Sequence, residues 1–381
     1  MIQINDKKKC SGCEACTNIC PKNCIEMKLD EHGFRYPNVN QYKCVNCHLC
    51  ENVCPMNRVK PKESFSPKVF AVQNKNNDIR KESSSGGVFT LLAEEIINQN
   101  GIVFGAVLNE YLEVEHLSVS EKEHIAALRG SKYLQSHIKD SYKQVRNDLH
   151  SGQMVLFSGT GCQIAGLKSF LGKEYSNLLT VEVVCHGVPS EMIFKQYIED
   201  METKLQQKVK SINFRNKNQG WSNYHVSITL NDDSTLSGKA MENDFMKGYI
   251  WNLYLRPSCK DCPFKCMNSG SDILLGDFWG INELGSLWND DQGTSAVFVN
   301  TNNGENLLDT VKEKTIIQEV DVNMATRFNP CIIRPVEKSN DIYAELSNDT
   351  FHHIIEKHRP EQPSLTLSQK IKNRLKKVIR R

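Results

Sequence analysis

Nine of the fifteen cysteines lie within the first 54 residues, and eight of these nine form two copies of one motif. Both copies read C-x2-C-x2-C-x3-C-P, with members Cys10, Cys13, Cys16, Cys20 and Pro21 in the first and Cys44, Cys47, Cys50, Cys54 and Pro55 in the second. Three thiolates at this spacing can occupy three corners of a cubane, while the fourth cysteine reaches across to the other cluster. The motif therefore predicts two [4Fe–4S] clusters with interleaved ligands.

The interleaving assigns each of the eight cysteines to one cluster. The first ligand set is Cys10, Cys13, Cys16 and Cys54, and the second is Cys44, Cys47, Cys50 and Cys20. Paired C-x2-C also builds zinc sites, but two complete copies of the longer motif favour iron–sulfur clusters. This block resembles the bacterial two-cluster ferredoxins. Cys24 lies outside the motif, and we expect it to be a small buried hydrophobe.

Five of the six remaining cysteines fall in three short segments. These are Cys162 in SGTGCQ, Cys185 in VCHGVPS, and Cys259, Cys262 and Cys266 in RPSCKDCPFKC. Two of them follow apparent strands and three share a tight loop, so they could converge at the carboxyl edge of a sheet and hold one more cluster. The residues alone leave inert core cysteines, or a zinc knuckle that includes Cys266, equally open. Cys331 stands alone.

The elements that must position these residues alternate between apolar strands and amphipathic helices. The pattern predicts strands at 103–108, 154–158, 178–184, 224–230 and 295–301, and helices at 87–100, 162–172 and 190–205. Such alternation is typical of the α/β class. We therefore expect a small α+β two-cluster ferredoxin domain followed by a larger mixed α/β domain.

Composition divides the chain into four blocks. The ferredoxin-type domain occupies 1–57, a polar linker with two prolines 58–67, the α/β domain 68–360 (in two parts, 68–150 and 151–360), and a basic amphipathic tail 361–381. Residues 364–381 place Leu367, Ile371, Leu375 and Val378 on one helical face among basic residues. This segment could touch an anionic membrane or an acidic partner, or remain a solvated basic helix.

Charge and hydropathy exclude several classes of protein. Lys and Arg total 47 against 45 Asp and Glu, so no charge imbalance argues for nucleic acid as a partner. No apolar run reaches the roughly 18 to 20 residues of a membrane span, and MIQINDKKKC lacks the apolar core of a signal peptide. We expect a cytoplasmic protein, where a reducing environment makes disulfides unfavourable and points the cysteines toward metal chemistry.

A second resemblance, to a family other than the ferredoxins, extends from about Ser83 to Gly280. It is carried by SSSGGVFT (83–90), RGSKYLQS (129–136), FSGTGCQIAGL (157–167), CHGVPS (185–190), FRNKNQGW (214–221), RPSCKDCPF (256–264) and DILLGDFWGI (272–281). In these segments the chain resembles the beta subunits of coenzyme F420-reducing hydrogenases and dehydrogenases. That family of flavin and iron–sulfur oxidoreductases includes the 7-hydroxymethyl chlorophyll a reductases.

The resemblance implies a third [4Fe–4S] cluster and one FAD. The implied cluster ligands are Cys162, Cys185, Cys259 and Cys262, with Cys266 as a substitute. The implied flavin contacts are Ser85, Gly86, Gly87, Ser131, Lys132, Tyr133, Gly159, Thr160, Gly161, Asp277 and Trp279. The glycines before the helix at 87–100 would offer backbone N–H groups to a phosphate. A G-x-G-x-x-G fingerprint is absent, because Ile164 occupies its last position. Solvation of Lys132, and burial of Tyr133 and the aromatic residues near Asp277 in the core, are the competing interpretations.

Two functions follow from this set of cofactors. A flavin can join two-electron hydride chemistry to the one-electron chemistry of clusters, which predicts an oxidoreductase acting on F420 or another small organic molecule. Its electrons would pass to or from a redox partner protein or a ferredoxin. His186 is a candidate proton relay, and no other catalytic side chain is assigned. The alternative is an electron-transfer subunit, without catalysis of its own, in a larger redox complex.

Overall fold

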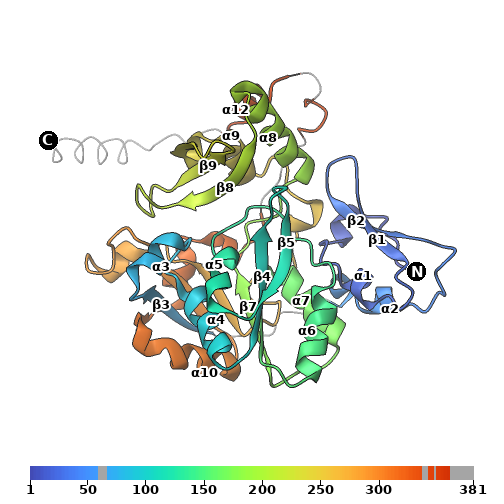
Figure 1. Ribbon diagram of the computed structural model, residues 1–381, viewed down its shortest axis with the longest axis horizontal. Helices are drawn as coiled ribbons and strands as arrows, with labels where there is room; N and C mark the ends of the chain where they lie inside the picture. Colours follow the sequence, from blue (N-terminus) through green and yellow to red (C-terminus); the bar gives the residue numbers. More distant parts are fainter. Residues whose placement is uncertain (59–66, 337–341, 347–348, 361–381) are drawn as a thin grey trace.

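The computed structural model describes residues 1–58, 67–336, 342–346 and 349–360. They form a small N-terminal domain beside a larger body that contains two sheets (Figure 1). The basic tail with its expected membrane or partner contact, and all of the linker except Arg58 and Pro67, lie outside the described residues. Within the described ranges, no helix combines the length and apolarity that crossing a membrane requires.

The N-terminal domain repeats in structure as it does in sequence. It contains α1 (Ala15–Ile19), the antiparallel strands β1 (Ile25–Leu29) and β2 (Arg35–Val39), α2 (Leu49–Asn52) and two short 3-10 helices (Lys7–Lys9 and Pro55–Asn57). Both α-helices begin after a residue in the left-handed region, Glu14 with φ 61° and His48 with φ 60°. These two residues hold the same position in the two motif copies, so both cysteine loops turn in the same way.

An eight-stranded mixed sheet forms the centre of the body. Its strands are β3 (Lys68–Asn74), β4 (Ile102–Leu108), β5 (Val114–Val119), β6 (Val155–Gly159), β7 (Leu178–Val183), β11 (Ile273–Asp277), β12 (Ser295–Val299) and β13 (Thr315–Glu319), in the order β13-β3-β12-β11-β7-β6-β4-β5. The inner strands β4, β6, β7 and β11 run parallel, and the others run antiparallel to their neighbours. All five residues of β6 are buried, as expected for a parallel strand covered on both faces.

Helices cover both faces of this sheet. On one face α4 (Val88–Asn98), α5 (Ile125–Leu128) and α10 (Asn302–Val311) pack on residues such as Leu156 and Val181. On the other face α6 (Ser141–His150) and α7 (Gly161–Leu171) pack on Phe157 and join the N-terminal domain in one core (Figure 1). Two short helices, α3 (Asn77–Glu82) and α11 (Val322–Arg327), flank β3.

A second, antiparallel sheet stands apart from the first. It pairs β8 (Val209–Asn216), β9 (His225–Leu230) and β10 (Thr235–Lys239), and it packs with α8 (Glu191–Leu205), α9 (Asp244–Ile250) and α12 (Phe351–Lys357). The mixed α/β class is thus confirmed, and all eight elements expected from the sequence exist within two residues at either end. The strand expected at 224–230 belongs to this second sheet and not to the alternating α/β unit.

Candidate functional site

The first cavity of interest lies inside the N-terminal domain. It is lined by Cys10, Cys13, Cys16 and Cys54, together with apolar residues that include Ile4 and Met27. Cys54 comes from the second motif copy and the other three from the first. Burial raises the pKa of Cys13 to about 12, so this thiol would ionise only beside a group that supplies positive charge.

The second cavity has the reciprocal composition. Its lining includes Cys44, Cys47 and Cys50 from the second motif copy and Cys20 from the first. Cys24 also lines it, buried as expected, with its Sγ 3.3 Å from that of Cys20. The structure therefore brings together the two interleaved sets of cysteines that the motif predicts, and it adds a fifth thiol to the second set.

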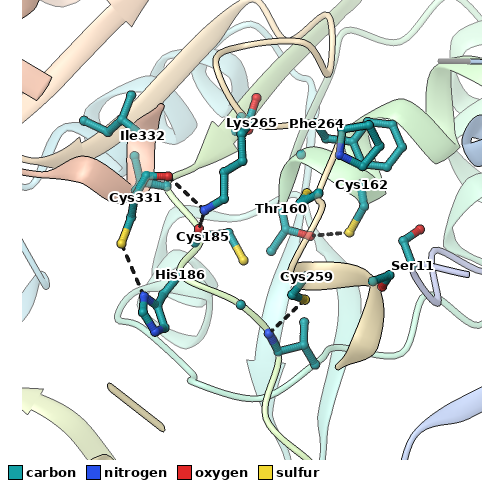
Figure 2. Close-up of a pocket in the computed structure, with 18 of the residues that line it drawn as sticks. Ser11, Thr160, Cys162, Cys185, His186, Cys259, Phe264, Lys265, Cys331 and Ile332 are labelled. Atoms are coloured by element: carbon teal, nitrogen blue, oxygen red, sulfur yellow. Dashed lines mark hydrogen bonds between the residues drawn. The ribbon is translucent and has the colours of Figure 1, made fainter. Parts of the chain in front are cut away.

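The third cavity lies at the carboxyl ends of β6 and β7, in the larger body (Figure 2). Cys162 stands on the first turn of α7, directly after β6, and Cys185 follows β7. Cys259 and Cys262 enter from the loop around the 3-10 helix Pro257–Cys259. Parallel strands open toward a shared edge, so cysteines from three distant segments line one space.

Cys331, and not Cys266, is the fifth cysteine of the third cavity. Cys266 does not line it, because the Cys266 thiol donates to the carbonyl of Ile333 at 2.9 Å. Cys331 does line it, and its Sγ lies 3.3 Å from Nδ1 of His186 (Figure 2). Sequence reasoning left Cys331 alone because no spacing connects it to the other cysteines. The candidate substitute ligand is therefore Cys331.

The third cavity is poor in positive charge. Burial raises the pKa of Cys185 to about 12 and that of Cys259 to about 11. One ammonium group lies nearby: Nζ of Lys265 donates to the backbone carbonyls of Cys185 and Cys331 (Figure 2). Burial also raises the pKa of Glu182, which lines the same space, to about 7. Ionised thiols in such a place require a metal to balance their charge.

The first and third cavities are neighbours. Ser11 and Met56 of the N-terminal domain help to line the third cavity. The helix α7 starts at that cavity and packs along the N-terminal domain, where Oγ of Ser169 donates to the carbonyl of Val53 at 2.6 Å. Gly166 on the same helix faces Cys13 so closely that an added Cβ would lie 3.1 Å from the Cys13 Cβ. The first cavity also adjoins the second, because Ile2 lines the first and its N–H donates to Sγ of Cys50 in the second. The three cavities thus follow one another in the order third, first, second.

The residues expected to contact flavin divide into two places. Thr160 and Gly161 line the third cavity, and Gly159 precedes them at the end of β6. The other eight, Ser85, Gly86, Gly87, Ser131, Lys132, Tyr133, Asp277 and Trp279, lie around the start of α4, in the segment after α5, and at the end of β11. Among the described residues, none of the three cavities is lined by members of both sets.

The SSSGG segment is shaped by packing. The N–H of Gly86 donates to Oγ of Ser295 at 3.0 Å, and its carbonyl accepts from the N–H of Asn74. A Cβ at Gly86 would clash with the carbonyl oxygen of Val72. Gly87 has φ +77°, a conformation that favours glycine, at the start of α4. The expectation that Gly86 offers its N–H to a phosphate is therefore corrected, because the side-chain hydroxyl of Ser295 already accepts from that group.

Replacing Gly86 with alanine is expected to lower the free energy of unfolding by about 1 to 3 kcal/mol, the usual cost of overpacking. The new methyl group would meet the backbone of Val72 and Ser295, which cannot rotate away. Gly238→Ala is the matched control, because no atom lies within 4 Å of its added Cβ. Urea denaturation of the two variants checks this, and equal stabilities would show that Gly86 is not required by packing.

Lys132 and Ser131 are engaged with the protein itself. Nζ of Lys132 donates to the carbonyls of Ala127 and Arg129 at 3.0 and 2.8 Å, and burial lowers its pKa to about 7. The N–H and the hydroxyl of Ser131 both donate to Oγ of Ser84. These contacts set the shape of the segment, and they leave the ammonium group of Lys132 with one of its three donors unassigned.

Asp277 and Trp279 belong to a buried polar and aromatic group that sequence reasoning missed. Asp277 accepts two hydrogen bonds from the guanidinium of Arg215, at 3.0 and 3.1 Å, and one from the indole of Trp221 at 2.9 Å. The ring of Trp221 stacks on that of Trp279 with centroids 4.5 Å apart, and the Arg215 guanidinium lies 4.1 Å above the ring of Tyr224. Arg215 and Trp221 both lie in FRNKNQGW, one of the segments that carry the family resemblance. That resemblance was the signal that could have identified them.

Two cations in this group are deeply buried. Lys217 donates to the carbonyls of Arg80, Ser85 and Gln292, and burial lowers its pKa to about 7. Arg215 also donates to the carbonyl of Ser84 and the hydroxyl of Tyr133. Its Nε is buried without a hydrogen-bond partner. Buried donors are normally satisfied, so this Nε–H is a donor that the described residues leave without an acceptor.

A chain of aromatic rings connects this group to the third cavity. The ring of Tyr133 lies 5.1 Å from that of Tyr249, which in turn lies 5.1 Å from the imidazole of His186. His186 contacts Cys331 through Nδ1 and Asn252 Oδ1 through Nε2, the latter at 2.6 Å. The two places that hold the expected flavin contacts are therefore linked by side chains in contact.

Comparison with known proteins agrees with the resemblance. Residues 152–324 match the family described as coenzyme F420 hydrogenase/dehydrogenase, C terminus of the beta subunit, and residues 9–58 match the 4Fe-4S dicluster domain. No curated protein matches the chain. Among solved structures, a chain of the F420-reducing [NiFe] hydrogenase complex from Methanosarcina barkeri is similar, with 16% identity, a TM-score of 0.46, and coverage of 78% of this chain and 93% of that one. Residues 152–324 are thus similar to the C terminus of the F420 hydrogenase/dehydrogenase beta subunit, and residues 9–58 to a 4Fe-4S dicluster domain.

Proposed function

We propose that the three cysteine-lined cavities hold one [4Fe–4S] cluster each. The ligands are Cys10, Cys13, Cys16 and Cys54 for the first, Cys44, Cys47, Cys50 and Cys20 for the second, and Cys162, Cys185, Cys259 and Cys262 for the third. The arrangement of the thiols supports this. In the part of the chain that the structure describes, no three His, Cys, Asp or Glu side chains converge closely enough to hold a single metal ion. Thiols around a cavity suit a cubane, whereas zinc needs them about 2.3 Å from one point.

We also propose that FAD binds against the group formed by Arg215, Asp277, Trp279 and Tyr133. The unpartnered Nε of buried Arg215 supports this, since it provides a donor for an acceptor atom of the flavin. The rings of Trp279 and Tyr133 offer flat surfaces beside it. A bound flavin would exchange a hydride with a substrate and single electrons with clusters. This position suits that role, because the rings of Tyr133, Tyr249 and His186 connect it to the third cavity.

In the proposed enzyme, the chain's own residues orient the reactants and keep water out. Asp277 holds the Arg215 guanidinium at a fixed angle through its two hydrogen bonds, and the stacked Trp221 and Trp279 cover one side. His186 is held by Asn252 beside the third cavity, where it can move a proton at Nδ1 or Nε2. The proposed substrate is a hydride carrier such as coenzyme F420 or another small organic molecule.

The serial order of the three cavities is the observation that carries the proposed function. It runs from the body to the surface of the N-terminal domain, where Cys47 is exposed. A partner that is itself a redox protein or a ferredoxin can approach the second cavity there. The same exposure supports the alternative, in which the chain only relays electrons between partners and catalyses nothing itself.

A reductant assay separates the enzyme from the relay. Anaerobically reconstituted chain with FAD is expected to lose its flavin absorbance when the hydride donor reduced F420, NADH or NADPH is added, with bleaching of the clusters following. Of the proposed cofactors, only the flavin can accept the two electrons of a hydride, because each cluster accepts one electron at a time. Stopped-flow spectra at flavin and cluster wavelengths give the order. A chain that binds no flavin, or whose clusters are reduced before it, would favour the relay.

A further inference from the structure

Arg256 is a buried arginine that extends from the third cavity into the N-terminal domain. It precedes the 3-10 helix that carries Cys259, and its N–H donates to the carbonyl of Val188, which lines the third cavity. Its side chain is 0% exposed. The backbone of this residue is thus fixed at one cysteine site while its guanidinium reaches another.

The guanidinium is anchored around Cys10. Nε donates to the Cys10 carbonyl at 2.9 Å, and Nη2 donates to the Cys10 Sγ at 3.5 Å and to the carbonyl of Arg35 at 2.8 Å. Nη1 donates to Oε1 of Gln135 at 3.3 Å, and the ring of Tyr36 lies 4.5 Å from the guanidinium carbon. Apart from the Cys10 sulfur, these contacts are with carbonyl, amide and aromatic groups, which carry no charge.

The N-terminal domain is built to admit this side chain. Gly12, between Cys10 and Cys13, has φ +71°, and a Cβ there would lie 3.0 Å from the guanidinium carbon of Arg256. Both the backbone conformation and the space therefore favour glycine at this position. The loop that presents the first set of thiols is shaped around the arginine.

The charge of Arg256 has no carboxylate to balance it among the residues that the structure describes. An uncompensated buried charge costs several kcal/mol, so a compensating negative charge is expected at this place. Four thiolates around a [4Fe–4S] cluster carry that negative charge, and reduction increases it. Charge and hydrogen bonds to the sulfurs are known determinants of cluster potential.

We propose that Arg256 is the counter-charge of the first cluster and raises its reduction potential through the hydrogen bond to Cys10 Sγ. This rests on the proposed function, in which Cys10 ligates that cluster. Arg256 is a positioning residue, because it acts through Cys10. Around the second cavity, the hydrogen bonds to cysteine sulfurs from described residues come from backbone N–H groups of Ile2 and Cys24 and from the Cys24 thiol. The hydrogen bond from Arg256 therefore acts on the first cluster, whereas its charge also reaches Cys259 of the third set.

The test is a redox titration, followed by EPR, of the full chain after anaerobic reconstitution. In Arg256→Gln, which removes the charge, one of the cluster potentials is expected to become more negative, with a tenfold fall in its reduction constant, or about 59 mV for one electron. Arg256→Lys keeps the charge and is expected to shift less, in the same direction. Arg146→Gln is the matched control, because its guanidinium stacks on Phe170 at 4.6 Å and contacts no cysteine.

Iron content separates the possible failures. Unchanged potentials in Arg256→Gln with full iron would overturn the role of Arg256 while leaving the clusters in place. If Arg256→Gln loses iron, Arg256→Met, which also removes the charge, is measured with full iron instead, and an unchanged potential there overturns the inference. A chain in which Cys10→Ala retains all of its iron would instead contradict the proposed ligands of the first cluster.

Discussion

Removing the third cluster is expected to take one third of the iron from the protein. Reconstituted chain should hold about twelve iron and twelve sulfide, and Cys162→Ala combined with Cys331→Ala about eight, because the cavity then lacks both a proposed ligand and its substitute. Iron and acid-labile sulfide analysis measures both. The flavin should still accept a hydride in this variant, while reduction of the two N-terminal clusters becomes slower than in the unmodified chain.

Two cysteines serve as controls for this prediction. Cys266→Ala should keep about twelve iron, since the Cys266 thiol faces the carbonyl of Ile333 and does not line the cavity. Cys331 lines the cavity and could take over a vacant corner, so the decisive variant is Cys162→Ala combined with Cys331→Ala. Retention of about twelve iron in that double variant, or only about eight in the unmodified chain, would contradict a third cluster.

Asp277→Ala is expected to have the largest effect on stability. The substitution leaves Arg215, whose side chain is 4% exposed, without its carboxylate, and it removes the acceptor of the Trp221 indole. Breaking a buried pair from one side costs about 3 to 5 kcal/mol, because the remaining charge is uncompensated. Urea denaturation should show this loss in the free energy of unfolding. Any FAD bound by the chain should also dissociate more readily.

An exposed ion pair provides the comparison. Asp233 pairs with Lys210 at 2.6 Å on the surface, with 74% and 55% of the two side chains exposed, so Lys210→Ala should change stability by no more than about 1 kcal/mol. Asp277→Asn keeps an acceptor for Trp221 and should fall between the two. An Asp277→Ala variant as stable as Lys210→Ala would mean that Arg215 finds another partner and that the group is not held by this pair.

Local spacing was enough to predict the two N-terminal sets of cysteines. Each motif copy spans eleven residues from its first cysteine to its fourth, and the chain over so short a distance has few ways to present its thiols. The mixed α/β class and eight of its elements were also predictable, because apolar periodicity reports which face of a strand or helix is buried. These features depend on neighbours in sequence, and the cavities and strands agree with them.

Only the tertiary structure decided which distant residues meet. Arg256 reaches Cys10 across 246 positions and His186 reaches Cys331 across 145, and no periodicity in the sequence connects such pairs. The same holds for Gly86, where local pattern favoured a phosphate-binding turn but the backbone of β3 and β12 occupies the space. Burial creates these roles: Arg215 and Cys331 become informative only when the fold brings Arg215 to Asp277 and Cys331 to the third cavity, which a linear pattern does not encode.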